Sequence, residues 1–83
     1  MNNHANSRFW ILYEALPPEI QRLADKNFKL FLNNPSHPSL HFKRVGRYWL
    51  ARVGSAHRAL AVDVEDGLLW VWIGGHDEYD RLI

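Results

Sequence analysis

The stretch from residue 48 to residue 73 reads YWLARVGSAHRALAVDVEDGLLWVWI, and its pattern decides the fold. Three runs of apolar, β-branched and aromatic residues are separated by two short turn-forming segments. Runs of this kind predict three strands, over residues 48–53, 57–64 and 68–73. Gly54-Ser55 marks the first turn and Glu65-Asp66-Gly67 the second, and Asp-Gly between apolar runs is a strong hairpin signal. The stretch therefore predicts an antiparallel meander of three strands.

A helix is predicted upstream of this meander. Pro17 and Pro18 suit a first helical turn, where the missing N–H is not needed, and Glu19 complements the positive end of the helix. Apolar residues then recur at helical spacing and predict a buried stripe, which consists of Ile20, Leu23, Ala24, Phe28 and Phe31. The segment 33–38 holds two prolines and two asparagines, so the helix is expected to end there.

The segment Arg8–Glu14 is rich in aromatic and β-favouring residues, so it predicts a further strand that joins the same sheet. Together these elements predict an α+β fold over residues 1–83, with residues 1–7 flexible. In this fold an N-terminal strand and a helical layer pack on an antiparallel sheet that ends in the three-stranded meander. Eighty-three residues are enough for one such domain and too few for two.

The composition excludes several classes of function. The chain has no Cys, so it forms no disulfide and offers no thiolate as nucleophile or metal ligand. No apolar run reaches the roughly 18–20 residues that a membrane span needs, and the polar N-terminus lacks the order of a secretion signal. We therefore expect a cytoplasmic protein without a membrane partner. Phosphate-loop, dinucleotide-binding and serine-nucleophile motifs are also absent.

The net charge of +1 hides an uneven distribution. Five basic residues and no acid lie in the segment 41–58, namely Lys43, Arg44, Arg47, Arg52 and Arg58. Six acids and no Lys or Arg lie in the segment 63–80. Such a division can create a positive patch on a nearly neutral molecule, or both segments can be solvated faces of the sheet.

Arg52 and Arg58 flank the first turn of the meander. If the loop holds three residues, the two arginines lie opposite each other on one face of the sheet. Directly opposed like charges destabilise a hairpin unless an anion lies between them, so this pair predicts a site for a phosphate or for a carboxylate of a partner protein. In the alternative register, shifted by one residue, the arginines diverge and each reaches water.

His76 follows the third predicted strand after Gly74-Gly75, and Tyr79 comes three residues later. Histidine can act as acid and base near neutral pH, tyrosine can position a substrate, and glycines let a ligand approach the backbone. The alternative is that His76 is an ordinary loop residue. The set of His41, His57 and His76 has no recognisable zinc spacing, so we expect no metal and no other cofactor.

Lys43, Arg44 and Arg47 precede the meander and are candidates for contacts to a nucleic-acid backbone. Aromatic residues of the meander offer stacking faces for unpaired bases. For Trp70 and Trp72 burial in the core is the favoured interpretation, because alternating tryptophans on a central strand usually pack beneath a helical layer.

The order of these segments resembles the RelE/ParE superfamily of bacterial toxins. The resemblance runs from about Phe9 to Ile83 and rests on the predicted initial strand and on five passages that follow it in order: LPPEI at 16–20, NPSHPSLHFKRV at 34–45, YWLARVG at 48–54, RAL at 58–60 and HDEY at 76–79. It implies a toxin of a type II toxin–antitoxin system, neutralised by a cognate antitoxin. One branch of the superfamily cleaves mRNA, commonly on the ribosome, and another poisons DNA gyrase without nuclease chemistry.

The resemblance also implies roles for particular residues. Arg52 and Arg58 match the strand arginines of the nuclease branch, and His76 and Tyr79 match its C-terminal active-site pair. Lys43, Arg44 and Arg47 match only its general basic region. We therefore expect an mRNA interferase whose RNA cleavage is independent of metal, with these four matched residues at the catalytic site. Alternatives are a non-catalytic gyrase inhibitor and an inactive relative that binds an antitoxin.

Overall fold

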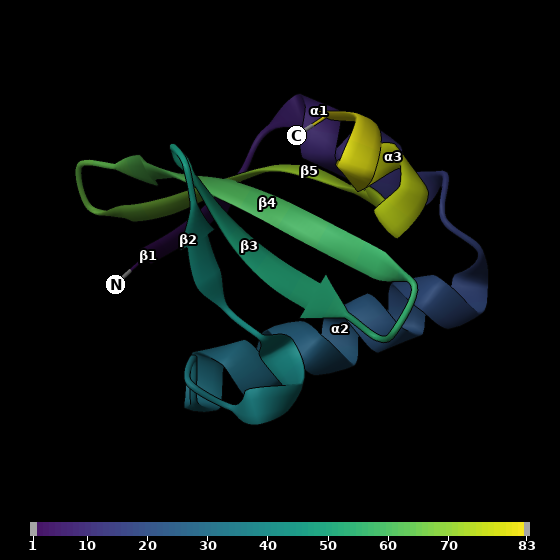
Figure 1. Cartoon of the computed structure of the whole chain (residues 1–83), viewed down its shortest axis with the longest axis horizontal. Helices are drawn as coiled ribbons and strands as arrows, with labels where there is room; N and C mark the ends of the chain where they lie inside the picture. The colour runs from purple at the N-terminus through teal and green to yellow at the C-terminus, as the bar shows by residue number, and fades with distance from the viewer. Residues whose placement is uncertain (1, 83) are drawn as a thin grey trace.

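The computed structural model describes residues 2–82, and its sheet carries helices on both sides (Figure 1). Along the chain the elements are β1 (Asn2–Ala5), α1 (Ser7–Glu14), α2 (Pro18–Asn33), the 3-10 helix η1 (Pro38–Leu40), β2 (Lys43–Val45), β3 (Tyr48–Val53), β4 (His57–Val64), β5 (Gly67–Gly75) and α3 (His76–Leu82). The five strands form one sheet in the order β1-β5-β4-β3-β2. β1 is parallel to β5 and the other neighbours are antiparallel, so the fold is α+β with a mixed sheet.

The predicted meander is confirmed. β3 and β4 coincide with the strands predicted over 48–53 and 57–64, and β5 contains the strand predicted over 68–73. The first turn leaves three residues between β3 and β4, and Gly54 there adopts a φ of 65°, which glycine tolerates and most residues do not. β2 adds a short hairpin partner at the β3 edge of the sheet.

The strand predicted over Arg8–Glu14 is wrong, because these residues form helix α1. Asn6 lies in an extended conformation just before this helix, and its side-chain oxygen accepts a hydrogen bond of 2.9 Å from the N–H of Phe9. This N-cap starts a helix whose residues Phe9, Leu12 and Tyr13 pack against the sheet at helical spacing. Aromatic content favours a strand in isolation, but the cap and this packing favour a helix here.

The N-terminal strand lies earlier, at Asn2–Ala5, within the segment for which flexibility is expected from the sequence. The side-chain amide of Asn2 donates to Asp66 over 2.9 Å, and its backbone N–H donates to the Asp66 carbonyl over 3.1 Å. A Cβ at Gly67 would come within 2.0 Å of the Asn2 carbonyl oxygen, so the glycine is what allows β1 to approach β5.

α2 begins and ends where the sequence predicts, and its apolar stripe is partly confirmed. Phe31 is buried, and Leu23 and Ala24 pack against the core. Phe28 differs from the prediction, since 41% of it remains exposed. None of the helices within residues 2–82 is long and apolar enough to cross a membrane.

A β-bulge places the two tryptophans of β5 on opposite faces of the sheet. Trp70 pairs with Ala61 and Trp72 with Leu60, so Val71 is an extra residue on β5. Trp70 packs edge-on against Phe31 of α2, whereas Trp72 belongs to a second cluster with Leu50 and Leu60 on the side of α3. Both tryptophans are buried, which confirms the core interpretation for them.

Candidate functional site

A cavity of about 300 Å³ lies on the α3 side of the sheet. Its lining residues are His41, Lys43, Leu50, Arg52, Arg58, His76, Tyr79 and Asp80. The fold thus brings the four predicted catalytic residues to one cavity, together with one of the three residues predicted to contact nucleic acid. Segments far apart in the sequence supply them, because β2, β3, β4 and α3 all meet at this face.

Arg52 and Arg58 are direct cross-strand partners, as a three-residue loop predicts. Arg58 Nη1 donates to the carbonyl oxygens of His57 at 2.8 Å and Ser55 at 3.3 Å, and Arg52 Nη1 lies 3.4 Å from His41 Nε2. Within the described residues neither guanidinium forms an ion pair with an acid. Two opposed cations without a counter-charge favour an anion between them.

His76 is the first residue of α3, not a loop residue. Its backbone N–H donates to the Ala56 carbonyl over 2.9 Å, which ties the start of α3 to the β3–β4 turn. Tyr79 follows one turn later and packs on the cluster of Leu50, Leu60 and Trp72. The direct step from β5 into α3, together with this packing, positions both side chains at the cavity.

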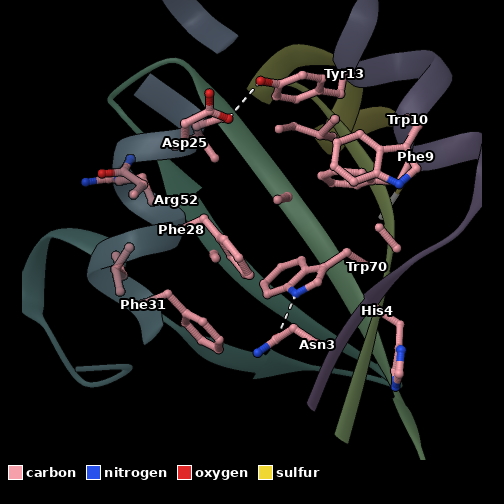
Figure 2. A pocket seen from close by; sticks show the side chains of 18 residues that line it. Asn3, His4, Phe9, Trp10, Tyr13, Asp25, Phe28, Phe31, Arg52 and Trp70 are labelled. Atoms are coloured by element: carbon pink, nitrogen blue, oxygen red, sulfur yellow. Dashed lines mark hydrogen bonds between the residues drawn. The ribbon is translucent and has the colours of Figure 1, made fainter. Parts of the chain in front are cut away.

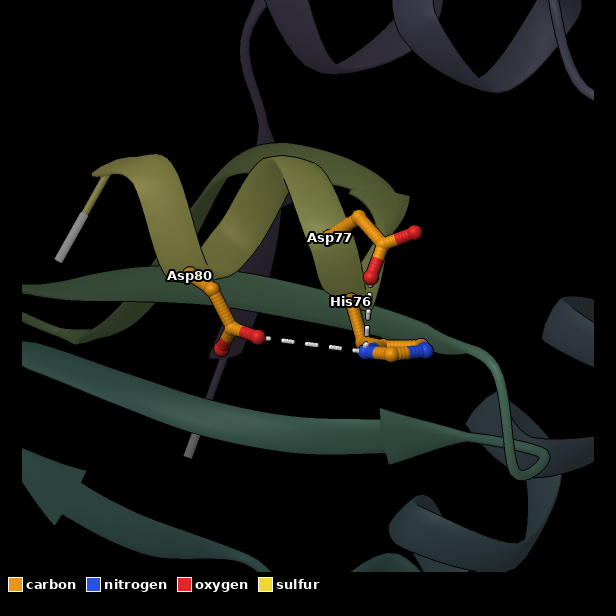
Figure 3. A group of neighbouring side chains, drawn as sticks. All are labelled: His76, Asp77 and Asp80. Carbon is orange, nitrogen blue, oxygen red and sulfur yellow. Dashed lines mark ion pairs between the residues drawn. The ribbon is translucent and has the colours of Figure 1, made fainter.

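Asp80 also lines the cavity, and the sequence reasoning did not assign it a role. Figure 3 shows His76 with two acids beside it: Nδ1 lies 3.4 Å from an oxygen of Asp77 and 3.9 Å from an oxygen of Asp80. The spacing of four residues between His76 and Asp80 on a helix is the signal that could have indicated this pair. Its ligand atoms lie close enough together to hold a metal ion, but the cavity's lysine and two arginines favour an anion there instead.

The three residues predicted to contact nucleic acid separate in the structure. Lys43 lines the cavity. Arg44 points to the opposite face, where it pairs with Asp63 and lies 5.1 Å from the centre of the Trp49 ring. Arg47 lies 5.4 Å from the centre of the Tyr48 ring, in the turn between β2 and β3. The side chains of successive residues in a strand point to opposite faces of the sheet, so Lys43 and Arg44 cannot belong to the same binding surface.

The way in which the stability of the fold changes at acid pH is expected to depend on the contacts of Asp63 with Trp49 and Arg44. Hydrogen bonds from the Trp49 indole and from Arg44 hold the pKa of Asp63 below its usual value. A lowered carboxyl pKa stabilises the fold at pH values above the unfolded pKa of about 3.9, and this contribution disappears as the pH falls through the folded pKa. We therefore expect Asp63→Asn to lose less stability than the wild type between about pH 5 and pH 2.

Denaturant unfolding at a series of pH values measures this difference. Glu65→Gln is the matched control, since Glu65 is an exposed acid of the same hairpin and forms no ion pair within residues 2–82. Parallel pH profiles for Asp63→Asn and the wild type would rule out this role of Asp63.

A second cavity, of about 240 Å³, lies on the opposite face between α1, α2 and the sheet (Figure 2). Its walls are mainly apolar, with Phe9, Trp10, Phe28 and Trp70 among the lining residues. The Tyr13 hydroxyl donates to Asp25 over 2.7 Å at this cavity, which raises the pKa of Tyr13. Arg52 also borders this cavity and is the single Lys or Arg among its described lining residues, whereas Lys43, Arg52 and Arg58 all line the cavity on the α3 side. The candidate catalytic site is therefore the cavity on the α3 side.

No family model matches the sequence, and no curated protein is similar enough to count as a relative. Solved structures do match. A chain of the RelB–RelE antitoxin–toxin complex from Methanococcus jannaschii is 16% identical, with a TM-score of 0.72 over 96% of this chain and 99% of that one. The YoeB/ParE toxin from Agrobacterium tumefaciens is 14% identical, with a TM-score of 0.69 over 92% and 99%.

The isolated Escherichia coli RelE toxin is 10% identical, with a TM-score of 0.64 over 98% of this chain and 97% of that one. The coverage is nearly complete in both directions, so the likeness extends over the whole domain and not over one motif. The chain therefore has the same fold as these RelE and YoeB/ParE toxin structures.

Proposed function

We propose that this protein is the toxin of a type II toxin–antitoxin system and acts as a cytoplasmic mRNA interferase. The observation that carries the proposal is the convergence of Arg52, Arg58, His76 and Tyr79 on one cavity, in which neither arginine is paired with an acid from residues 2–82. The likeness to RelE structures supports the toxin class through the fold, and the cavity supports the nuclease branch through its chemistry.

The proposed reaction is metal-independent cleavage by a ribose 2′-OH. The 2′-oxygen attacks the adjacent phosphorus in line, the bond from phosphorus to the 5′-oxygen breaks, and a 2′,3′-cyclic phosphate and a 5′-OH result. A proton must leave the attacking 2′-oxygen, and the departing 5′-oxygen must receive one; His76 carries out one of these transfers and solvent water the other. Arg52 and Arg58 stabilise the negative charge that develops on the phosphorane.

The remaining cavity residues position the RNA. Tyr79 holds the nucleotide at the scissile bond, and Lys43 contacts a neighbouring phosphate. The cavity is open, and two histidines line it, His76 and the His41 that lies beside Arg52. The proposal assigns to the ribosome the task of fixing mRNA in a geometry ready for attack.

A cognate antitoxin is the proposed protein partner. Solved structures that resemble this chain come from a RelB–RelE complex of M. jannaschii and from the intact RelBE complex of E. coli. Acidic residues of an antitoxin would supply the counter-charge that Arg52 and Arg58 lack among the described residues.

A second candidate function is inhibition of DNA gyrase without catalysis. Two observations favour it. The net charge is only +1, and Asp80 lowers the positive charge of the cavity that RNA would enter.

Induced expression followed by sequencing of RNA ends separates the two functions. We expect growth arrest with discrete new 5′ ends inside coding regions, and we expect both to disappear in the double variant Arg58→Ala/His76→Ala. A gyrase inhibitor would instead produce DNA damage without discrete RNA cuts. Full toxicity of the double variant would show that the site assignment is wrong.

A further inference from the structure

Two carboxylates lie near the same nitrogen of the His76 imidazole ring, Nδ1. Oxygens of Asp77 and Asp80 lie 3.4 Å and 3.9 Å from Nδ1. Figure 3 shows both carboxylates on the Nδ1 side of the ring, while the other ring nitrogen points away from them. The side chain of His76 is about half exposed, at 47%, and it lines the cationic cavity.

The helix fixes the positions of these acids relative to the ring. Residues four apart lie on the same side of a helix, so Asp80 stands beside His76 for as long as α3 is formed. The first turn of α3 is held to the sheet by the His76 N–H bond to Ala56 and by Tyr79 in the second apolar cluster. Glu78 turns the other way and accepts from the N–H of Gly75 over 3.4 Å.

We propose that Asp77 and Asp80 are positioning residues, which keep a proton on Nδ1 of the neutral ring and present Nε2 to the bound phosphodiester. A neutral imidazole has one N–H donor and one acceptor nitrogen, so a carboxylate at Nδ1 decides which nitrogen carries the lone pair. The lone pair on Nε2 can then take the 2′-OH proton. The role in cleavage rests on the proposed function, whereas the state of the ring does not.

Nitrogen-15 NMR of the histidine ring tests the inference without RNA. At about pH 8.5, where an ordinary imidazole is neutral, we expect the wild type to show protonated Nδ1 and unprotonated Nε2 at His76. In the double variant Asp77→Asn/Asp80→Asn, the nitrogen-15 chemical shifts of the two His76 ring nitrogens should move toward the averaged values of a free imidazole. Glu78→Gln, which removes a charge from the same helix, should keep the wild-type pattern. Tryptophan indole resonances report whether each variant is folded.

Cleavage of a defined mRNA on purified ribosomes provides the second measurement. The double aspartate variant should lose about tenfold in kcat, because proton transfer weakens. Its KM should be unchanged or lower, because the loss of two negative charges at the cavity favours RNA binding. Glu78→Gln should cleave at the wild-type rate. An equal loss in Glu78→Gln would indicate a general effect of helix charge and would overturn the inference.

The two measurements also separate this inference from the proposed function. The expected tautomer pattern in a wild type that never cleaves RNA would support the positioning of His76 and refute the nuclease. The opposite combination is a wild type that cleaves RNA but has the same His76 ring chemical shifts as the double aspartate variant. It would refute the positioning role of the two aspartates and would leave the proposed nuclease function in place.

Discussion

Arg58→Ala is expected to lower the rate of RNA cleavage by about a hundredfold or more while the fold remains intact. Loss of one group that stabilises a developing oxyanion typically costs 10²–10³ in rate. Arg58 lies directly opposite Arg52 on the sheet, so removing it relieves repulsion between like charges. This relief offsets the loss of its hydrogen bonds to the His57 and Ser55 carbonyls. Cleavage of mRNA on ribosomes and denaturant unfolding measure the two effects.

Arg44→Ala is the matched control for this experiment. It removes the same charge from another strand of the same sheet, but Arg44 faces the other side of the sheet and is already paired with Asp63. We expect its cleavage rate to stay within about twofold of the wild type, because solvent and salt screen the interaction between the Arg44 charge and a phosphate bound on the other side of the sheet. A comparable loss in both variants would mean that overall charge, not the cavity, governs activity. Arg58→Lys should recover only part of the rate, because an ammonium lacks the planar fork of a guanidinium.

Trp72→Ala is expected to lower the free energy of unfolding by about 3–5 kcal/mol. Trp72 is buried with Leu50 and Leu60, and Tyr79 of α3 packs on the same cluster. Small domains have a total stability of about 5–15 kcal/mol, so this loss is a large fraction of the whole. The cavity left by the indole should also loosen α3, and with it the positions of His76 and Tyr79. Chemical denaturation monitored by circular dichroism measures the change.

Trp10→Ala is the corresponding control, because it deletes the same side chain from an exposed position. Half of Trp10 is accessible to solvent, although its ring makes edge contacts with Phe9 and Tyr13. We expect a loss of about 1 kcal/mol, the size of such aromatic contacts. Equal losses at the two positions would show that Trp72 does not support a core on the α3 side.

The sequence by itself determined the meander and the helix α2. Both depend on signals within a few residues: alternating apolar runs, Asp-Gly in a turn, and prolines before an amphipathic repeat. The pairing of Arg52 with Arg58 also follows from local information, because the loop length alone sets which residues of a hairpin face each other. That is why Arg52 and Arg58 could be named as a facing pair before their other neighbours were known.

Only the tertiary structure decided the rest. The strand β1 forms because it pairs with β5, which lies more than sixty residues away along the chain. No local pattern in Asn2–Ala5 predicts that pairing. The bulge at Val71 moves Trp72 to the α3 side, although a regular strand would keep it on the face of Trp70. Asp80 enters the cavity because α3 starts directly at the end of β5. Such features depend on burial and strand pairing between segments that are distant in the sequence. These contacts stabilise the fold only once the distant segments have come together, so no local sequence pattern predicts them.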